Sequence, residues 1–432
     1  MAHSTPNSHH PDTLAVLAGR AAGEAGRPFA VPLDPSAGYS TPPGDDPASH
    51  FNGEASGPVD WSRSHPVVAL LEERVAALDG GIGAVACASA PAALLLAIAT
   101  ASARGGHVVA ASNVGGDRRE LLAFALPRLG IETTFVEARD PDAWREAIRP
   151  ETVLLVADAL ADPSLDVLDI PAIGDISRRA RVPLLVDASL VTPALARPLA
   201  HGAHLVLHSA TGYLAGHGTV AGAVLVDGGR FDWAASGRHA ALSSTNVDEC
   251  DAPWTDESAV AAFLLRAKRI TRPRLGLALA PQAAHDAVRG LETLALRMAR
   301  HASNARALAD FLAGEASVAR VRHPSHPGDP DHDLATRLMA GSGGGLVAFD
   351  IERGFDGARR FLATLSVIGH GHLAGAPRSL ALHPAGSTFS HLDDEARRAL
   401  GAGPGTIRLS AGLEHPADLV DDVARALKAA SR

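Results

Sequence analysis

Residues 182–227, VPLLVDASLVTPALARPLAHGAHLVLHSATGYLAGHGTVAGAVLVD, contain short runs that are rich in valine and leucine. These runs are VPLLVDAS (182–189), AHLVLHS (203–209) and GAVLVD (222–227). They are apolar on successive positions, which is typical of strands buried on both faces. We therefore expect neighbouring strands of one sheet that is covered by helices.

Upstream sequence repeats this pattern. Further strand-like runs are HVVAAS (107–112), TFVEA (134–138) and VLLVADA (153–159). Helical patterns lie between the runs, at 91–104, 116–128 and 170–181. The alternation predicts an α/β fold with a mostly parallel sheet and helices on both faces. Ligands of such sheets bind outside the carboxyl ends of the strands.

The chain divides into three parts by composition. Residues 1–60 are rich in Pro, Gly, Ser, His and Asp, which predicts an irregular N-terminal arm. Residues 61–275 carry the α/β pattern of a large domain. A helical stretch from about 283 to 314 opens the remainder, 276–432, and short strands and a final helix follow it. We expect a smaller C-terminal α+β domain there.

Overall composition excludes several function classes. Of the 432 residues 46% are hydrophobic and 20% are charged, as in ordinary globular proteins. A formal charge of −9 argues against a nucleic-acid partner. We find no signal peptide and no membrane span of roughly 20 apolar residues, so we expect a cytoplasmic protein.

Cysteine and histidine spacing predicts no metal site. The cysteines Cys87 and Cys250 fit neither a disulfide framework nor a zinc motif. The His-rich segment 323–333, HPSHPGDPDHD, is interpreted as a solvated loop. The chain also holds only two lysines, Lys268 and Lys428. Any covalent imine to a cofactor must use one of these.

Several blocks of the sequence resemble one known family. The stretch VLHSATGYLAGHGTVAGAVLVDGGRFDW (206–233) is similar to the Cys/Met-metabolism family of fold-type-I pyridoxal-phosphate enzymes, and most closely to its O-acetylhomoserine sulfhydrylases. Matching blocks elsewhere include HPVVALLEERVAALDGG (65–81), DPSLDVLDIPAI (162–173), SLALHPAGSTFSHL (379–392) and IRLSAGLEHPADLVDDV (407–423). The resemblance implies a fold-type-I architecture, pyridoxal phosphate as cofactor, and a dimer or tetramer.

The resemblance also shows a loss at the central catalytic position. Family members carry a lysine after Ser-Ala-Thr, which forms the imine with the cofactor and moves protons on the substrate. The matching residue here is Gly212. A tyrosine that stacks on the cofactor ring is matched by Val114, and an asparagine near the ring hydroxyl is matched by Asp162. We therefore do not expect a covalently bound cofactor at position 212.

Phosphate-binding features are also altered. A Ser-Gly-Met turn of the family is matched by Ser89, Ala90 and Pro91, and proline has no N–H to donate. The resemblance still implies a cofactor contact for Ser89. A tyrosine and an arginine of the neighbouring subunit reach the phosphate in the family. Of that pair only Arg63 is present.

Other family positions are retained. Asp187 matches the acid that pairs with the pyridinium nitrogen, and Ser209 and Thr211 match phosphate-binding hydroxyls. Arg408 matches the arginine that holds the substrate α-carboxylate, and Ser379 matches a neighbour of that carboxylate site. These residues are the candidate cofactor and substrate contacts.

Two histidines near Gly212 are candidates for a replacement base. His208 and His217 flank the position, and a histidine can act as general base where a lysine is absent. The family motif has histidines at both positions as well, so their presence alone does not indicate a new role.

Three functions remain open on the sequence. The first is a transferase of sulfur amino-acid metabolism that performs γ-replacement on an O-acylhomoserine with non-covalently held pyridoxal phosphate. The second is a pseudoenzyme, acting as a homo-oligomer or as the partner of an active paralogue. The third is a repurposed cleft that takes a small molecule with a carboxylate, anchored by Arg408. We favour a diverged site over an intact one, because several site positions depart together.

Overall fold

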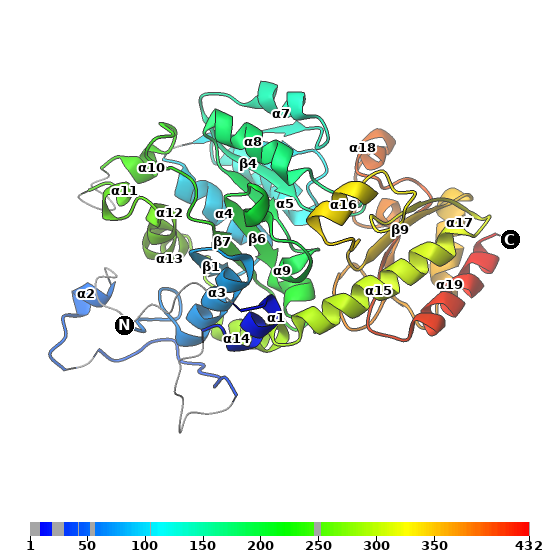
Figure 1. Cartoon of the computed structure of the whole chain (residues 1–432), viewed down its shortest axis with the longest axis horizontal. Helices are drawn as coiled ribbons and strands as arrows, with labels where there is room; N and C mark the ends of the chain where they lie inside the picture. Colours follow the sequence, from blue (N-terminus) through cyan, green and yellow to red (C-terminus); the bar gives the residue numbers. More distant parts are fainter. Residues whose placement is uncertain are drawn as a thin grey trace.

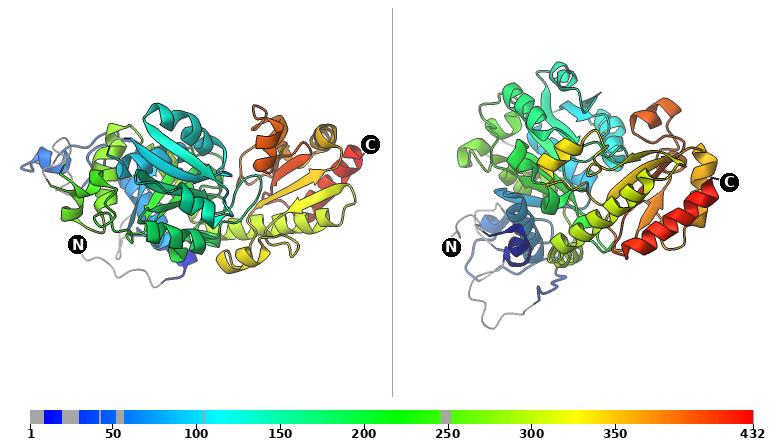
Figure 2. Two further views of the ribbon diagram at one scale, coloured as in Figure 1. Left: turned by 90° about the horizontal axis from the view of Figure 1, so that it is seen from above. Right: turned by 45° about the vertical axis from the view of Figure 1, so that its right-hand side comes forward.

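The computed structural model describes residues 9–19, 30–41, 43–51, 57–103, 105–245 and 252–431. The chain forms two sheets that lie side by side, each with its own helices (Figures 1 and 2). Cys250 lies outside the described residues. None of the helices in the described ranges is long and apolar enough to cross a membrane.

The larger sheet has seven strands in the order β1-β7-β6-β5-β4-β2-β3. Strands β2 to β6 pair in parallel, whereas β7 is antiparallel to both β6 and β1. The strands are β1 (Gly83–Cys87), β2 (Gly106–Ala111), β3 (Ile131–Val136), β4 (Thr152–Asp158), β5 (Leu184–Asp187), β6 (Leu205–Ser209) and β7 (Ala223–Asp227). The predicted mostly parallel sheet is confirmed. Strand β1, which pairs at the sheet edge, was not predicted.

Helices cover this sheet. Helix α3 packs on β1 and β7, and α4 packs on β1, β4, β6 and β7. The helices of this half with at least four residues are α3 (Pro66–Asp79), α4 (Ala90–Ala101), α5 (Gly116–Glu120), α7 (Pro141–Ala147), α8 (Ile170–Ala180), α9 (Thr192–Leu195), α10 (Ala240–Ser243), α11 (Trp254–Glu257) and α12 (Ala262–Arg266). Shorter or irregular turns are η1 (Leu121–Ala125), α6 (Leu126–Arg128), η2 (Pro198–His201), η3 (Ala210–Leu214), η4 (Ala267–Thr271) and α13 (Arg272–Arg274).

The second sheet has five strands in the order β10-β11-β12-β9-β8. Helix α15 runs from the large-sheet half along this sheet, and α17 and α19 pack against each other beside it (Figure 1). The elements are α14 (Pro281–Leu291), α15 (Leu294–Ala313), β8 (Val318–Arg322), α16 (His332–Leu338), β9 (Leu346–Ile351), α17 (Gly354–Thr364), β10 (Gly369–His370), β11 (Leu380–Leu382), η5 (Pro384–Gly386), α18 (Asp394–Ala399), β12 (Thr406–Ser410) and α19 (Pro416–Ala430). The domain boundaries after residues 60 and 275 stay predictions.

The structure adds two local details to the expectations from the sequence. The helical stretch 283–314 consists of two helices, because the helical conformation is interrupted between α14 and α15. The buried Arg297 guanidinium donates to the Gly290 and Leu214 carbonyls at this break. The N-terminal arm also contains helices α1 (Pro11–Leu17) and α2 (Pro47–Phe51). Helix α1 is ordered by tertiary contacts, since the fully buried Arg74 donates to the Ala18 carbonyl.

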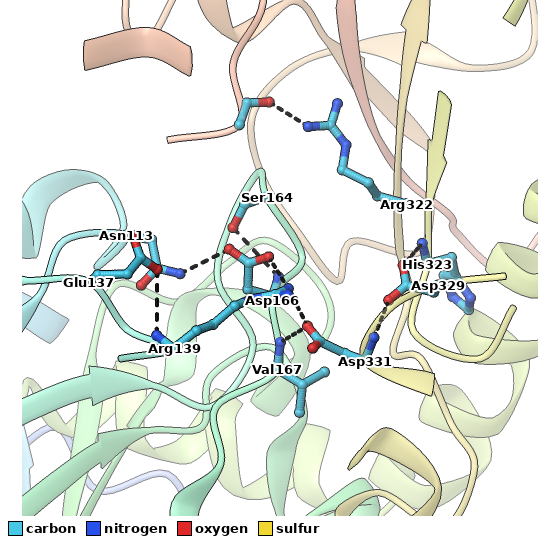
Figure 3. A network of polar contacts seen from close by, with 11 residues as sticks. Asn113, Glu137, Arg139, Ser164, Asp166, Val167, Arg322, His323, Asp329 and Asp331 are labelled. Carbon is cyan, nitrogen blue, oxygen red and sulfur yellow. Dashed lines mark hydrogen bonds and ion pairs between the residues drawn. The ribbon is translucent and has the colours of Figure 1, made fainter. Parts of the chain in front are cut away.

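A polar network fixes the loop after β4 (Figure 3). The Arg139 Nη2 atom lies 2.5 Å from Asp166 Oδ1 and 2.6 Å from Asp331 Oδ2. The Val167 amide also donates to Asp331 Oδ2, at 2.9 Å. Asn113 donates to Asp166 from the loop after β2. This loop, which begins near Asp162, is therefore tied to both halves of the molecule.

Candidate functional site

A pocket of about 330 Å³ lies between the carboxyl ends of β4, β5 and β6 and the second sheet. The starts of α4 and α5 close it on one side, and the segment 372–374 closes it on another. Its lining includes six hydroxyl-bearing residues, namely Ser89, Ser189, Ser209, Thr211, Tyr213 and Thr388. Apolar contacts come from Pro163, Leu190, Leu373, Leu382 and Phe389.

Gly212 lines this pocket, and backbone from the second half lies directly over it. A Cβ atom at Gly212 would meet the Ala374 carbonyl oxygen at 2.7 Å. Real Cβ atoms do not approach a backbone oxygen so closely, so a side chain at this position requires the 372–374 segment to move. Position 212 has therefore lost the amine and also the space in which a side chain begins.

Neither lysine of the chain lines the pocket. Lys268 Nζ lies 2.6 Å from Glu72 Oε2, in a pair on the far side of β1 from the site. Lys428 is exposed on α19. Among the pocket-lining residues no amine is present that could form an imine.

Asp187 is paired with an arginine of the chain itself. Strands β4 and β5 place Asp158 and Asp187 opposite one another in register at the strand ends. The Arg118 guanidinium lies between them, 2.8 Å from Asp158 Oδ2 and 2.9 Å from Asp187 Oδ2. Burial, together with the nearby Asp187 charge, raises the pKa of Asp158 to about 6 in spite of Arg118. Arg118 thus compensates two buried carboxylates that would otherwise repel each other.

Arg408 is paired in the same way. From β12 its Nε and Nη2 atoms reach Asp162 Oδ1 and Oδ2 at 3.1 and 2.8 Å, and its Nη1 donates to the His372 carbonyl at 3.1 Å. The two contacts to Asp162 form the bidentate geometry that arginine uses for a carboxylate ligand. The arginine side chain is only 3% exposed, whereas that of Asp162 is 32% exposed, so only the arginine side of this pair is shielded from water.

Helix α4 offers few donors for an anion. Ser89 caps the helix, its Oγ atom accepting from the Ala92 amide at 3.2 Å, and its carbonyl accepts from the Ala93 amide at 3.0 Å. Pro91 has no amide hydrogen. In the first turn only the Ala90 amide is left for a ligand, so the helix N-terminus does not form an anion cradle.

Ser209 and Thr211 line the pocket and also hold local structure. Ser209 Oγ accepts from the Thr211 amide at 3.3 Å, and Thr211 Oγ1 accepts from the Gly222 amide at 3.3 Å. Both hydroxyls keep a hydrogen to donate. The two hydroxyls can therefore donate to a ligand while they also stabilise the local turn.

The remaining predicted residues lie outside the pocket lining. His208 is fully buried with its Nε2 atom 2.6 Å from Asp79 Oδ2, on the side of α3. Burial opposes its charge, but the Asp79 carboxylate outweighs burial and raises the pKa of His208. His217 is exposed and its Nδ1 atom contacts the Ala215 carbonyl. The expectation of a replacement base at His208 or His217 therefore has no geometric support.

Arg63 and Ser379 also differ from their expected surroundings. Arg63, just after the N-terminal arm, pairs with Asp60 at 2.7 Å, is 39% exposed and lies outside the pocket lining of its own chain. Ser379 is buried, and its hydroxyl donates to Glu414 Oε2 and accepts from the Gly412 amide, both at 2.7 Å. Val114 is fully buried and cannot stack on a ligand in the pocket.

Sequence reasoning missed the residues that decide the pocket's charge. Arg118 and Asp158 were not singled out, although Asp158 lies near the end of the apolar run 153–159 and Arg118 lies at the start of the helical pattern 116–128. A polar residue at the carboxyl end of a parallel strand is a usable signal. The pairing of Asp162 with Arg408 joins residues 246 positions apart and left no local signal.

These residues do not fit pyridoxal phosphate in the manner the family resemblance implies. The carboxylate for the ring nitrogen is neutralised by Arg118, and the helix turn for the phosphate keeps one free amide. The arginine for the substrate carboxylate is taken by Asp162, and the lysine position is covered by Ala374. We therefore derive no step of a reaction through that cofactor in this chain.

Comparisons with known proteins agree on the ancestry of the fold. The family model described as Cys/Met metabolism PLP-dependent enzyme matches residues 12–428. The O-acetyl-L-homoserine sulfhydrylase of Leptospira meyeri is 34% identical over 434 residues, covering 98% of each chain. The O-acetyl-L-homoserine sulfhydrylase 1 of Thermus thermophilus is 34% identical over 92% of this chain and 94% of its own.

A solved structure is also similar. It is a protein from Campylobacter jejuni described as an O-acetylhomoserine (thiol)-lyase, with a pyridoxyl-lysine monophosphate in its chain. The TM-score is 0.93 at 27% identity, over 97% of this chain and all of that one. The predicted fold-type-I architecture is therefore confirmed.

Replacing Gly212 with alanine tests the close approach of Ala374. We expect Gly212→Ala to lower the free energy of unfolding by about 1–3 kcal/mol, because the new methyl group overlaps a backbone oxygen. Urea denaturation measures this. Gly38→Ala is the matched control, since a Cβ there meets nothing within 4 Å. An equally stable Gly212→Ala variant would show that the 372–374 segment moves freely.

Replacing Arg118 with methionine tests the buried charge pairing. We expect Arg118→Met to cost about 3–5 kcal/mol at pH 7, because two buried carboxylates lose their cation. The control is Arg119→Met, whose guanidinium lies over the Phe135 ring and pairs with no buried carboxylate in the described contacts. Chemical denaturation at several pH values provides both measurements.

The pH dependence of this loss has a defined sign. In wild type the pKa of Asp158 in the folded state is raised above its unfolded value of 3.8 although Arg118 lowers it. Without Arg118 we expect this folded-state pKa to rise further. The folded variant then holds a proton that the unfolded chain releases, so its stability falls as pH rises from about 4 through the folded-state pKa. The loss should be smaller at pH 5 than at pH 7. A loss that does not change with pH would contradict this assignment.

Proposed function

The chain belongs to the Cys/Met metabolism PLP-dependent enzyme family, and from this premise we propose that it is a diverged, O-acetylhomoserine sulfhydrylase-like member that does not perform the family's lysine-dependent chemistry. One observation carries the proposal. No pocket-lining residue has an amine, and the position of the family's lysine is a glycine covered by the Ala374 carbonyl.

The geometry does not favour an active sulfhydrylase with non-covalently held cofactor. Such an enzyme needs Asp187 and Arg408 to face the cofactor and the substrate. Both side chains are instead engaged by Arg118 and Asp162 at 2.8–2.9 Å. A ligand that used them would have to displace Arg118 from Asp187 and Asp162 from Arg408.

Two roles are compatible with this proposal. The pocket persists with hydroxyl and apolar groups, which supports a repurposed ligand site. Arg63 is partly exposed and lies outside the pocket, which supports a contact with a second copy or with a lysine-bearing paralogue. The preserved pocket favours the first role, and the partner role is the second candidate.

Borohydride reduction in the presence of pyridoxal phosphate tests the proposal. We expect no adduct that saturates at one equivalent, since Lys268 is paired with Glu72 and the exposed Lys428 lies outside the pocket lining and would label only incidentally. Peptide mass spectrometry locates any adduct. A homocysteine assay with O-acetyl-L-homoserine and sulfide should stay at the blank rate.

The Thermus thermophilus O-acetyl-L-homoserine sulfhydrylase 1, treated identically, serves as the positive control. One equivalent of reduced cofactor on either lysine of this chain would refute the proposal. So would homocysteine formation above the blank that follows the protein concentration. Lys268→Arg distinguishes an incidental surface adduct from one that supports activity, because it removes an amine that lies outside the pocket.

A further inference from the structure

The connection between β11 and β12 is long and forms part of the pocket wall. These two strands are antiparallel neighbours, yet residues 383–405 lie between them. Loops that join paired antiparallel strands usually have about 2–5 residues. Pro384, Thr388 and Phe389 of this connection line the pocket. Long loops beside a binding pocket commonly serve as covers for it, so the connection is a candidate lid.

Residues 384–402 of this connection have a small hydrophobic core of their own. Phe389, Leu400 and Ala402 are buried together, and the half-buried Leu392 packs against them. Among the described residues this cluster is separate from the core of the large half and from that of the second half. Helix α18, which lies in this segment, stands apart from α19 (Figure 1). A segment with its own core can move without opening either main core.

The polar contacts of residues 384–400 are also local. In the described part of the chain, the side-chain hydrogen bonds and ion pairs of this stretch stay within it or reach the adjoining His383 carbonyl. Firmer ties lie at its two ends. The His383 Nε2 atom lies 2.9 Å from the Pro404 carbonyl oxygen, and Arg322 of β8 donates to the Gly401 carbonyl at 2.8 Å. The stretch is therefore held at its stem and not along its length.

Gly401 forms a fixed point at one end of this stretch. Its φ of +74° lies in the left-handed region, and a Cβ atom there would meet Ser164 Cα at 2.8 Å. Glycine thus permits the backbone to approach the loop that carries Asp162. A fixed point beside a self-contained segment is the arrangement of a hinged cover.

The opposite wall of the pocket is tied by charge. Arg118 joins the carboxyl ends of β4 and β5, and Arg408 holds the loop that carries Asp162. Phe389, in contrast, contributes an apolar ring to the wall, so its displacement breaks no ion pair. The pocket of about 330 Å³ is therefore enlarged most readily by displacement of residues 384–400.

We propose that residues 384–400 form a lid that opens as one unit about Pro384 and Gly401 and sets the size of the molecules that can enter the pocket. Phe389 forms the pocket-facing part of the lid, and its cluster with Leu400 stabilises the closed position. The inference goes beyond the proposed function, because it concerns entry into the pocket and not the missing amine.

Two maleimides of different size test the lid in the full chain. Ser209→Cys in a Cys250→Ser background places a thiol in the pocket at the end of β6, while the fully buried Cys87 is kept. Labelling by N-ethylmaleimide and by fluorescein-5-maleimide is followed by peptide mass spectrometry, and each rate is divided by the rate with glutathione. The bulky reagent should react about tenfold or more slowly than the small one, because it requires the lid to open.

Leu400→Ala weakens the core of the lid and is the decisive variant. It should raise the rate of the bulky reagent at least about tenfold and that of the small reagent less than about threefold, because the lid shifts toward its open position. Hydrogen exchange should become faster in residues 384–400 and stay unchanged in β11 and β12. If Leu400→Ala does not fold, as judged by circular dichroism, Leu392→Ala replaces it.

Leu427→Ala is the matched control. It makes the same truncation in the core of the second half, where Leu427 is buried on α19. Because this residue is not part of the lid's core, neither labelling rate should change more than about threefold.

Three labelling results would overturn the inference. They are equal normalised rates of the two reagents with the lid intact, no acceleration of the bulky reagent in Leu400→Ala, and an equal acceleration in Leu427→Ala. Faster hydrogen exchange that extends into β11 and β12 would also contradict it, since the segment would then not move as a separate unit. None of these outcomes depends on imine formation, so a failure here is distinguishable from failure of the proposed function.

Discussion

The ion pairs of Arg118 with Asp158 and Asp187 are the constraint on which the site depends. Parallel pairing of β4 and β5 sets the two carboxylates opposite one another at the strand ends, almost fully buried. Two such groups cannot both stay ionised without a cation between them. In this chain the cation belongs to the protein. Asp187 is therefore retained as a residue, and in this structure its charge is paired with Arg118.

The second half of the molecule completes the site by close packing. The 372–374 segment places a backbone oxygen where a side chain at Gly212 would begin, and β12 delivers Arg408 to Asp162. The turn η3 is held from the other side by Arg297, which donates to the Tyr213 and Leu214 carbonyls. The loop that carries Asp162 is anchored through Asp166 (Figure 3). The result is a pocket whose two arginines are each paired with carboxylates of the chain.

The fold of this chain is similar to that of its relatives, whereas several residues of the pocket differ from those that the family resemblance implies. Identity of 34% over 98% of a sulfhydrylase, and a TM-score of 0.93 to a solved relative, show that the architecture is preserved. A core tolerates extensive substitution when the apolar pattern and volume are kept. A reaction, in contrast, depends on a few side chains in defined positions, so its loss needs few changes. In this chain the departures from the residues that the resemblance implies at Pro91, Asp162 and Gly212 all lie in the pocket lining.

The amino-acid sequence by itself determined the parallel sheet, the helices between its strands and the absence of a lysine at position 212. These features follow from local apolar periodicity and from a single residue type, which need no knowledge of distant contacts. Strand β1 and the interruption between α14 and α15 were not predicted, because β1 consists largely of glycine and alanine, which are uncommon in strands, and the interruption involves the buried Arg297. Only the tertiary structure decided which charged residues pair, namely Asp162 with Arg408 and Arg118 with Asp187. It also decided that the Ala374 carbonyl lies over Gly212. Each of these contacts joins segments far apart in the chain, and its existence depends on how the two sheets pack, which no local pattern encodes.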